Sequence, residues 1–302
     1  MSMFEKRITA VASAIVIATG ALWGFYWLPV RSLMDLGLGG PWGTVGITLG
    51  AALLLAPLAL ADLRQIARAG PVVLISIALG GAAFALYSIG FVYGRVAIII
   101  LLYFLTPVWS TLIGRFVMGW MTPRLRYIAI GVGLLGLAVM LGAEGAVPIP
   151  RGLGEWMALA AGILWSVSTT GIRAKSELGA AASSFVFALG GLAASLALAL
   201  ALSPLPTLPL GTDLLKATGI ALLTGGLWWG LSLAGLMWAA VRLEPARVGL
   251  LLMMEVLVGA VSAAMLAGET LHPLEIVGGA LVLCAGILEV WPVRPRRAPP
   301  VR

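Results

Sequence analysis

The sequence predicts an all-α polytopic membrane protein of about ten transmembrane helices, with two five-helix halves in opposite orientation. Three observations support this fold. Hydrophobic residues make up 61% of the 302 residues and charged residues only 10%, against roughly 25% charged in an ordinary soluble domain. Apolar stretches long enough to cross a bilayer follow one another along the chain, and Lys and Arg gather in alternate loops.

Short Gly, Pro or charged breaks separate the apolar stretches. About 20 apolar residues cross a bilayer as a helix, whereas an open strand at that depth leaves backbone groups unpaired, and the alternation of a barrel strand is absent. We therefore expect helices over residues 8–30, 42–61, 71–92, 96–118, 125–143, 154–172, 181–203, 214–240, 245–267 and 273–291.

The first stretch follows Lys6 and Arg7, a pattern that also begins secretory signal peptides. Its length, its tryptophans Trp23 and Trp27, and the many spans after it favour a retained first helix.

Positive charge marks the cytoplasmic side of short loops. One side of the expected topology carries four basic residues: Arg31, Arg95, Arg151 and Lys216. The side of the N-terminus carries fourteen: Lys6, Arg7, Arg64, Arg68, Arg124, Arg126, Arg173, Lys175, Arg242, Arg247, Arg294, Arg296, Arg297 and Arg302. Both termini are therefore expected in the cytoplasm, and residues 293–302 form a basic cytoplasmic tail, which anionic lipid would also attract. Arg115 lies about one turn inside the fourth span, where its long side chain can reach the headgroups.

Composition also excludes several classes of function. The net charge of +7 is spread over alternate loops, so a nucleic-acid partner is not expected. With Cys284 and His272 as the single cysteine and histidine, neither a disulfide within the chain nor a Cys/His metal site can form, and we expect no cofactor. His272 is expected in a solvated loop. No Gly-rich loop followed by Lys-Ser/Thr is present for ATP.

Two matches within the sequence indicate an internal repeat. The segment GALW at 20–23 resembles GILW at 162–165, and the same spacing relates Arg31 to Arg173. The segment from Leu105 to Gly119 aligns without gaps to that from Met254 to Gly268. We expect two halves, residues 1–146 and 147–292. Since five spans are an odd number, the second half would enter the membrane from the opposite side, as in many secondary transporters.

Particular segments in this arrangement resemble the drug/metabolite transporter superfamily, in its ten-helix branch of two EamA-type repeats. They are LLYFLTP at 101–107, Glu244-Pro245-Ala246, Met254-Glu255, Gly268-Glu269 and Gly278-Gly279. The resemblance covers nearly the whole chain and is strongest to bacterial exporters of aromatic and other neutral amino acids, which implies a multi-pass protein of the bacterial inner membrane. The family commonly has Glu-Pro where this chain has Glu255-Val256, so the resemblance implies no proline kink there.

Glu255 is the acidic residue placed deep in an apolar span. It follows Pro245 by ten residues, or roughly 15 Å of helix, which places it near the middle of the bilayer. A carboxylate at that depth costs at least ~2.5 kcal/mol and should face a cavity or a partner. It would bind a substrate ammonium group or cycle a proton; the alternative is a neutral carboxyl that hydrogen-bonds a neighbouring helix.

Several other side chains are candidates for the wall of a central cavity. Pro107 removes a backbone donor in mid-span, so the fourth span is a candidate gate or simply a packing kink, with Thr106 and Tyr103 beside it. Trp23 and Trp165 occupy matching repeat positions away from span ends, and Tyr87, Trp228 and Trp229 are similar candidates, although each can equally serve helix packing. Tryptophans at span ends should anchor in the interface: Trp42, Trp120, Trp156, Trp238 and Trp291.

The sequence thus predicts a transporter that exports a small neutral or aromatic amino acid, or a related metabolite, by alternating access. Its partners are that small molecule and the bilayer, and a monomer suffices. Efflux of cationic compounds is the first alternative. A membrane-embedded lipid-modifying enzyme would need a nucleophile with a base, or a metal site, and neither is found; a purely structural protein would have no use for a mid-membrane acid.

Overall fold

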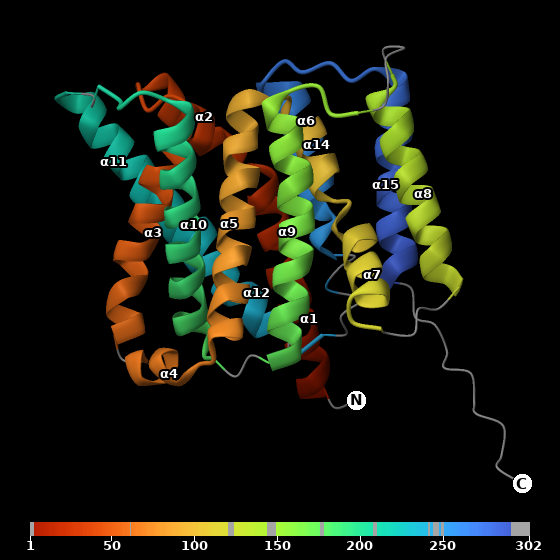
Figure 1. Ribbon diagram of the computed structural model, residues 1–302, viewed down its shortest axis with the longest axis horizontal. Coiled ribbons are helices and arrows are strands. Elements are labelled where there is room, and N and C mark those ends of the chain that lie inside the picture. The colour runs from red at the N-terminus through yellow and green to blue at the C-terminus, as the bar shows by residue number, and fades with distance from the viewer. Residues whose placement is uncertain are drawn as a thin grey trace, which may run out of the picture.

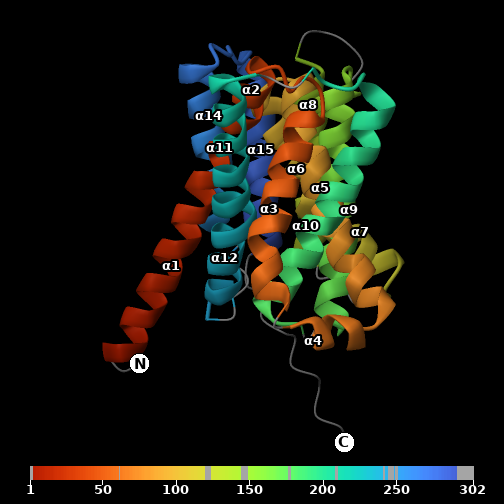
Figure 2. The same ribbon diagram turned by 90° about the vertical axis from the view of Figure 1, so that its left-hand side faces the viewer.

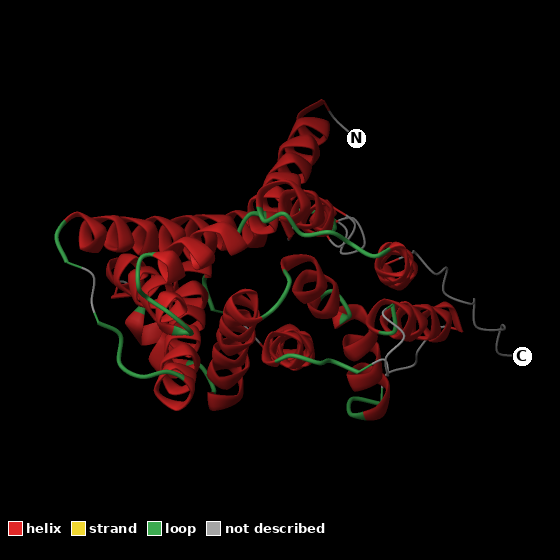
Figure 3. Ribbon diagram, turned by 90° about the horizontal axis from the view of Figure 1, so that it is seen from above, coloured by secondary structure: helices red, strands yellow, loops and turns green. Residues whose placement is uncertain are grey.

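The computed structural model describes residues 3–60, 62–119, 124–143, 149–175, 178–207, 210–240, 242–243, 248 and 251–290. Every regular element among these residues is a helix, and the helices stand side by side in one upright bundle (Figures 1 and 3). The all-helical fold class is therefore confirmed.

The described residues between 3 and 143 form eight helices. In order they are α1 (Met3–Gly24), α2 (Trp27–Asp35), α3 (Trp42–Leu60), α4 (Leu63–Arg68), α5 (Pro71–Tyr93), α6 (Val96–Tyr103), α7 (Thr106–Phe116) and α8 (Arg124–Leu141). The second half contains α9 (Leu153–Lys175), α10 (Ala180–Leu202), α11 (Thr212–Thr224), the π-helical segment η1 (Gly225–Leu231), α12 (Ser232–Ala240), α14 (Met254–Leu266) and α15 (Pro273–Val290).

Within the described residues, seven helical segments are long and apolar enough to cross a membrane. They are 7–35, 42–59, 71–93, 96–116, 124–141, 180–202 and 212–236, and two shorter apolar helices cover 254–266 and 273–288. This supports a multi-pass membrane protein. Many leucine, isoleucine and valine side chains on the bundle's outer wall are exposed, as a hydrocarbon environment requires.

A single helix was expected over residues 8–30, but a turn divides this span into α1 and α2. The chain turns at Phe25 and Tyr26, whose amides bond three residues back to Leu22 and Trp23. Pro29 supplies the reason, because it has no N–H to give to the Phe25 carbonyl and its ring crowds that group. The short helix α4 was also not expected; its Asp62-to-Arg68 segment is too charged to span, and its side chains are largely exposed.

Two further helices are interrupted at mid-height. The chain turns at Phe104 and Leu105 between α6 and α7, and at Met253 just before α14. In Figure 1 α7 occupies the lower part of the bundle and α14 the upper part, so the two begin at mid-height and point in opposite directions. Each is followed by a glycine with left-handed backbone, Gly119 (φ +69°) and Gly268 (φ +65°), a conformation that ends helices.

Glycines allow the helices to approach closely. A Cβ on Gly136 of α8 would lie 2.7 Å from the Gly278 carbonyl of α15, and one on Gly278 would lie 2.6 Å from the Gly136 carbonyl. A Cβ on Gly81 of α5 would collide with the Phe187 carbonyl of α10. In lipid, where burial of apolar surface drives association little, such close packing holds helices together.

The start of α1 and the end of α15 lie toward the lower side of the bundle, and α1 leans away from it (Figures 1 and 2). Of the tryptophans expected at span ends, Trp156 and Trp238 are exposed, and Trp42 donates its indole N–H to the Pro204 carbonyl (2.8 Å). His272 is exposed as expected.

Some residues on which the sequence predictions rest are not described in the structure, or their side chains are not. They are Lys6, Trp120, Arg173, Lys175, Glu244, Pro245, Ala246, Arg247, Trp291, Arg294, Arg296, Arg297 and Arg302.

Candidate functional site

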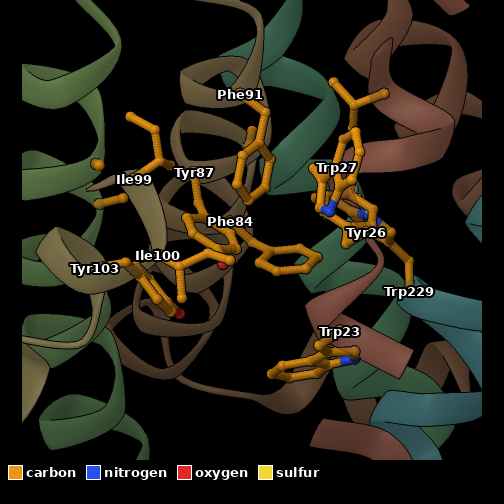
Figure 4. Packing of buried hydrophobic residues seen from close by; sticks show 14 of the residues in the cluster. Trp23, Tyr26, Trp27, Phe84, Tyr87, Phe91, Ile99, Ile100, Tyr103 and Trp229 are labelled. Atoms are coloured by element: carbon orange, nitrogen blue, oxygen red, sulfur yellow. Dashed lines mark hydrogen bonds between the residues drawn. The ribbon is translucent and has the colours of Figure 1, made fainter. Parts of the chain in front are cut away.

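Aromatic side chains from several helices meet in the middle of the bundle. Phe84 of α5 lies at their centre (Figure 4), with ring centroids 5.0 Å from Tyr26, 4.9 Å from Trp229 and 5.6 Å from Trp23. Phe84 also contacts Tyr87 at 5.9 Å and Phe187 at 6.3 Å. We call this set the aromatic cluster: Trp23, Tyr26, Phe84, Tyr87, Phe91, Tyr103, Trp165, Phe187, Trp228 and Trp229.

Glu255 borders the aromatic cluster and is 2% exposed. The Tyr87 hydroxyl donates a 2.8 Å hydrogen bond to its Oε1, and the Tyr87 ring stacks on that of Tyr103 with centroids 4.4 Å apart. Among the described residues no Lys or Arg forms an ion pair with Glu255. The acid therefore sits beside electron-rich rings, where a cation is its natural counter-ion.

The backbone also favours negative charge at Glu255. The residue lies in the first turn of α14, and a helix N-terminus carries a partial positive charge. The turn at Met253 makes this terminus available at mid-height. The chain makes this break without a proline directly after the glutamate, since the next residue is Val256.

The π-helical segment positions the two adjacent tryptophans. A π-turn inserts one extra residue per turn and is frequent at functional sites. Trp229 points into the cluster, where its indole N–H donates to the Tyr26 hydroxyl (3.0 Å), while the Trp228 indole donates to the Leu22 carbonyl (2.9 Å). A single helix was expected over 214–240, and the sequence pattern did not predict the π-helical segment within it.

A line of hydroxyl groups continues from Tyr26 to Ser88 and Thr44. The Tyr26 hydroxyl donates to Ser88 Oγ (3.1 Å), and Ser88 Oγ lies 2.8 Å from Thr44 Oγ1. On a second branch, the Trp23 indole donates to Ser232 Oγ (2.8 Å). The Ser88 and Ser232 hydroxyls therefore accept from the donors of Tyr26 and Trp23 inside the bundle, where water is scarce.

Trp23 and Trp165, the pair matched in the repeat, both reach the aromatic cluster. Trp23 packs against Phe84, and Trp165 lies 6.3 Å from Tyr103 and 6.0 Å from Phe187. The structure thus brings together six of the proposed cavity residues: Glu255, Tyr87, Tyr103, Trp23, Trp165 and Trp228.

Thr106 and Pro107 lie at the joint between α6 and α7. Among the described residues, neither forms a hydrogen bond with Glu255. Pro107 occupies the first turn of α7 and leaves the Tyr103 carbonyl, four residues earlier, without its usual backbone donor. The Thr106 hydroxyl takes that place with a 2.6 Å hydrogen bond to the Tyr103 carbonyl. From α9, the Ser166 hydroxyl donates to the Thr106 carbonyl (3.0 Å), so the interrupted backbone is satisfied by side chains.

Sequence reasoning missed three central residues, Tyr26, Phe84 and Phe187. Nothing in their local patterns separates them from ordinary packing side chains in an apolar helix. Tyr26 carried a usable signal, because the hydroxyl of a tyrosine within a span needs a hydrogen-bond partner when it is buried. In the described part of the chain, no group of three His, Cys, Asp or Glu side chains could hold a metal ion.

A groove of about 350 Å³ on the outer wall lies between α3 and α11, apart from Glu255. It is lined by apolar and small residues that include Leu49, Leu53 and Leu222. Its lining includes no charged side chain, so the groove suits hydrocarbon chains.

Comparison with known proteins identifies a fold and no family. No protein-family model matches the sequence, and no curated protein matches it. Among solved structures, 15 chains match. One of them, described only as "Crystal structure of protein", superposes with a TM-score of 0.59 at 19% identity, over 92% of this chain and 96% of its own. At this identity the similarity shows that the whole bundle is an existing fold, and it says nothing about a substrate.

Proposed function

We propose that the protein is a secondary transporter that moves a small neutral or aromatic amino acid, or a related metabolite, out of the cell by alternating access. One observation carries the proposal: a buried acidic side chain, Glu255, lies at the N-terminus of an interrupted helix beside a wall of aromatic rings. Interrupted helices whose ends meet near mid-membrane are a recurrent way to build transport sites.

The two interrupted helices also support an inverted repeat of five spans plus five. The α6–α7 joint and the turn before α14 lie at the start of the aligned segments from Leu105 and Met254, and the aligned glycines Gly119 and Gly268 share a left-handed backbone. α7 and α14 point in opposite directions. On this proposal ten spans place both termini in the cytoplasm, and the upper end of the bundle in Figure 1 faces outward.

The same features agree with the expected likeness to the ten-helix EamA-type branch of the drug/metabolite transporters, in a bacterial inner membrane. The domain division at residues 146 and 147 belongs to this proposal. We propose no catalytic activity, since the site offers one acid among hydroxyl, indole and phenyl groups, and general acid–base or nucleophilic chemistry requires a second, activating partner.

The site favours a substrate with an ammonium group. In its ionised form Glu255 supplies a negative charge, and the faces of Tyr87 and Tyr103 attract cations. An amino acid offers that group together with an apolar side chain for the aromatic cluster. A lipophilic organic cation offers it as well, so efflux of cationic compounds is the second candidate.

Uptake into liposomes would test the proposal. Purified protein is reconstituted, and a panel of labelled neutral amino acids and lipophilic cations is offered with and without a pH gradient. We expect saturable uptake of one class and a loss of at least tenfold on Glu255→Gln, which removes the charge and keeps the shape. Leakage that is independent of substrate would refute transport, and full uptake by Glu255→Gln would refute the role of the carboxylate.

The topology has its own test. Single cysteines at positions 31 and 173, in a Cys284→Ser background, should react with an impermeant maleimide from opposite sides of the membrane. Reaction from a common side would refute the inverted repeat.

A further inference from the structure

Four charged side chains join distant segments at the upper end of the bundle. Glu269, in the loop after α14, accepts hydrogen bonds from the backbone amides of Val96 (2.8 Å) and Ala97 (3.2 Å), and it pairs with Arg31 Nη2 at 3.2 Å. It therefore caps the start of α6 with a carboxylate, where the helix dipole favours negative charge. The capped helix and the capping residue are more than 170 positions apart in the sequence.

A second pair lies beside the first. Arg95 donates to both carboxylate oxygens of Glu275, at 2.6 and 3.0 Å, and to the Thr270 carbonyl at 2.6 Å. Glu275 also accepts from the His272 amide (2.8 Å). The acidic side chains are nearly buried, with relative exposures of 10% for Glu269 and 6% for Glu275, so each pair is stronger than an ordinary surface ion pair.

These pairs connect to the aromatic cluster through Phe91. Arg31 donates to the carbonyls of Phe91 (3.2 Å) and Gly94 (3.0 Å), and its guanidinium lies 5.3 Å from the centroid of Trp27. The Phe91 ring packs edge-on to Tyr87, with centroids 4.7 Å apart. Arg31 thus holds the backbone of Phe91, whose ring packs against Tyr87, the residue that donates to Glu255.

We propose that Arg31, Arg95, Glu269 and Glu275 form a clamp that keeps the outer end of the transport pathway closed, with Phe91 as its plug. The proposal rests on the transport function above. The clamp ties the α5–α6 turn and α2 to the α14–α15 loop and the first turn of α15, so it joins the two sequence halves. Outward opening must separate these segments and therefore break the pairs.

Accessibility of a buried cysteine tests the clamp without any transport measurement. Ser88 is fully buried, one turn of α5 below Phe91. Ser88→Cys in the Cys284→Ser background reports opening from outside when intact cells are treated with an impermeant maleimide. Arg95→Gln and Glu275→Gln should each raise its labelling rate about tenfold, within the 5–150-fold typical of coupling between conformational states.

Three controls make the result specific. The double exchange Arg95→Glu with Glu275→Arg restores opposite charges and should return the rate toward that of the parent. Lys216→Gln breaks an exposed pair with Asp213, 3.2 Å long, within α11, and should change nothing. A cysteine at Ser168, buried in α9 toward the other end, should remain unlabelled from outside.

Labelling of Ser88→Cys at the parent rate in both single variants would overturn the clamp, whatever the uptake assay gives. Equal labelling at position 168 would also overturn it, because it would indicate general loosening. If transport fails in liposomes while the clamp variants expose position 88, the transport proposal is wrong. The clamp would then still keep this end of the bundle closed.

Discussion

The Tyr87 hydroxyl donates a 2.8 Å hydrogen bond to the Glu255 carboxylate across 168 positions of sequence. This bond links α5, an uninterrupted helix of 23 residues, to the interrupted α14. α5 packs along both α9 and α10 and provides Phe84, Tyr87 and Phe91. The acid that we propose as the substrate anchor is thus held by a rigid element of the opposite half, which fixes its position without neutralising it by a basic residue.

Tyr87→Phe should lower the free energy of unfolding by about 1.5–3 kcal/mol if Glu255 is ionised, because a buried charge loses a donor. Binding of an amine ligand should weaken with it. Thermal unfolding in detergent, with and without ligand, measures both effects. Tyr127→Phe is the matched control, since Tyr127 is 46% exposed, and it should leave both unchanged. An unaltered melting temperature in Tyr87→Phe would contradict a stabilising bond.

Thr106 and Pro107 should show a strong energetic coupling. Thr106→Val alone leaves the Tyr103 carbonyl without its 2.6 Å donor, which should cost about 1–3 kcal/mol. In a Pro107→Ala background the new amide at 107 can bond that same carbonyl, so Thr106→Val should cost much less. A double-mutant cycle of unfolding free energies measures the difference. Additive effects would show that the hydroxyl does not replace the missing backbone donor.

Trp229→Phe should destabilise the bundle more than its size alone suggests. The substitution removes the 3.0 Å bond to the Tyr26 hydroxyl and opens space beside Phe84 and Phe187. We expect a loss of about 2–4 kcal/mol from the cavity and the lost donor together. Trp156→Phe, at a half-exposed site, should cost almost nothing. Similar melting temperatures for the two variants would remove Trp229 from the core of the site.

The helical elements were largely predictable because their cause is local. A run of about 20 apolar residues must form a helix in hydrocarbon, so most expected spans match observed helices within a few residues. Pro107 indicated a gate or a kink within the helix expected over 96–118, since a missing N–H acts on its own helix, and the structure shows two helices, α6 and α7, at this place. The break at Phe25 was equally readable from Pro29 and was overlooked.

The candidate site was predictable only in part, because its contacts are long-range. Depth along the helix identified Glu255, and the repeat identified Trp23 and Trp165. Hydropathy, however, does not reveal which face of a helix points inward when nearly every face is apolar. Phe84 and Phe187 therefore could not be distinguished from lipid-facing phenylalanines, and no local pattern predicted the π-helical segment that contains Trp229.

Gly81→Ala should separate two helices that the structure holds in direct backbone contact. The added methyl group would collide with the Phe187 carbonyl and lie 2.7 Å from the Gly191 amide, and neither backbone group can move away without shifting α10. We expect a loss of several kcal/mol, above the usual 1–3 kcal/mol for overpacking a core. Gly131→Ala is the control: the same change in α8 meets no atom within 4 Å, so the better helix propensity of alanine should stabilise the protein by up to about 1 kcal/mol. Because both variants add one methyl group to a transmembrane helix, opposite shifts in melting temperature would assign the difference to the α5–α10 contact. If Gly81→Ala melted at or above the parent temperature, the close approach of α5 and α10 that positions Phe84 and Phe187 would be refuted.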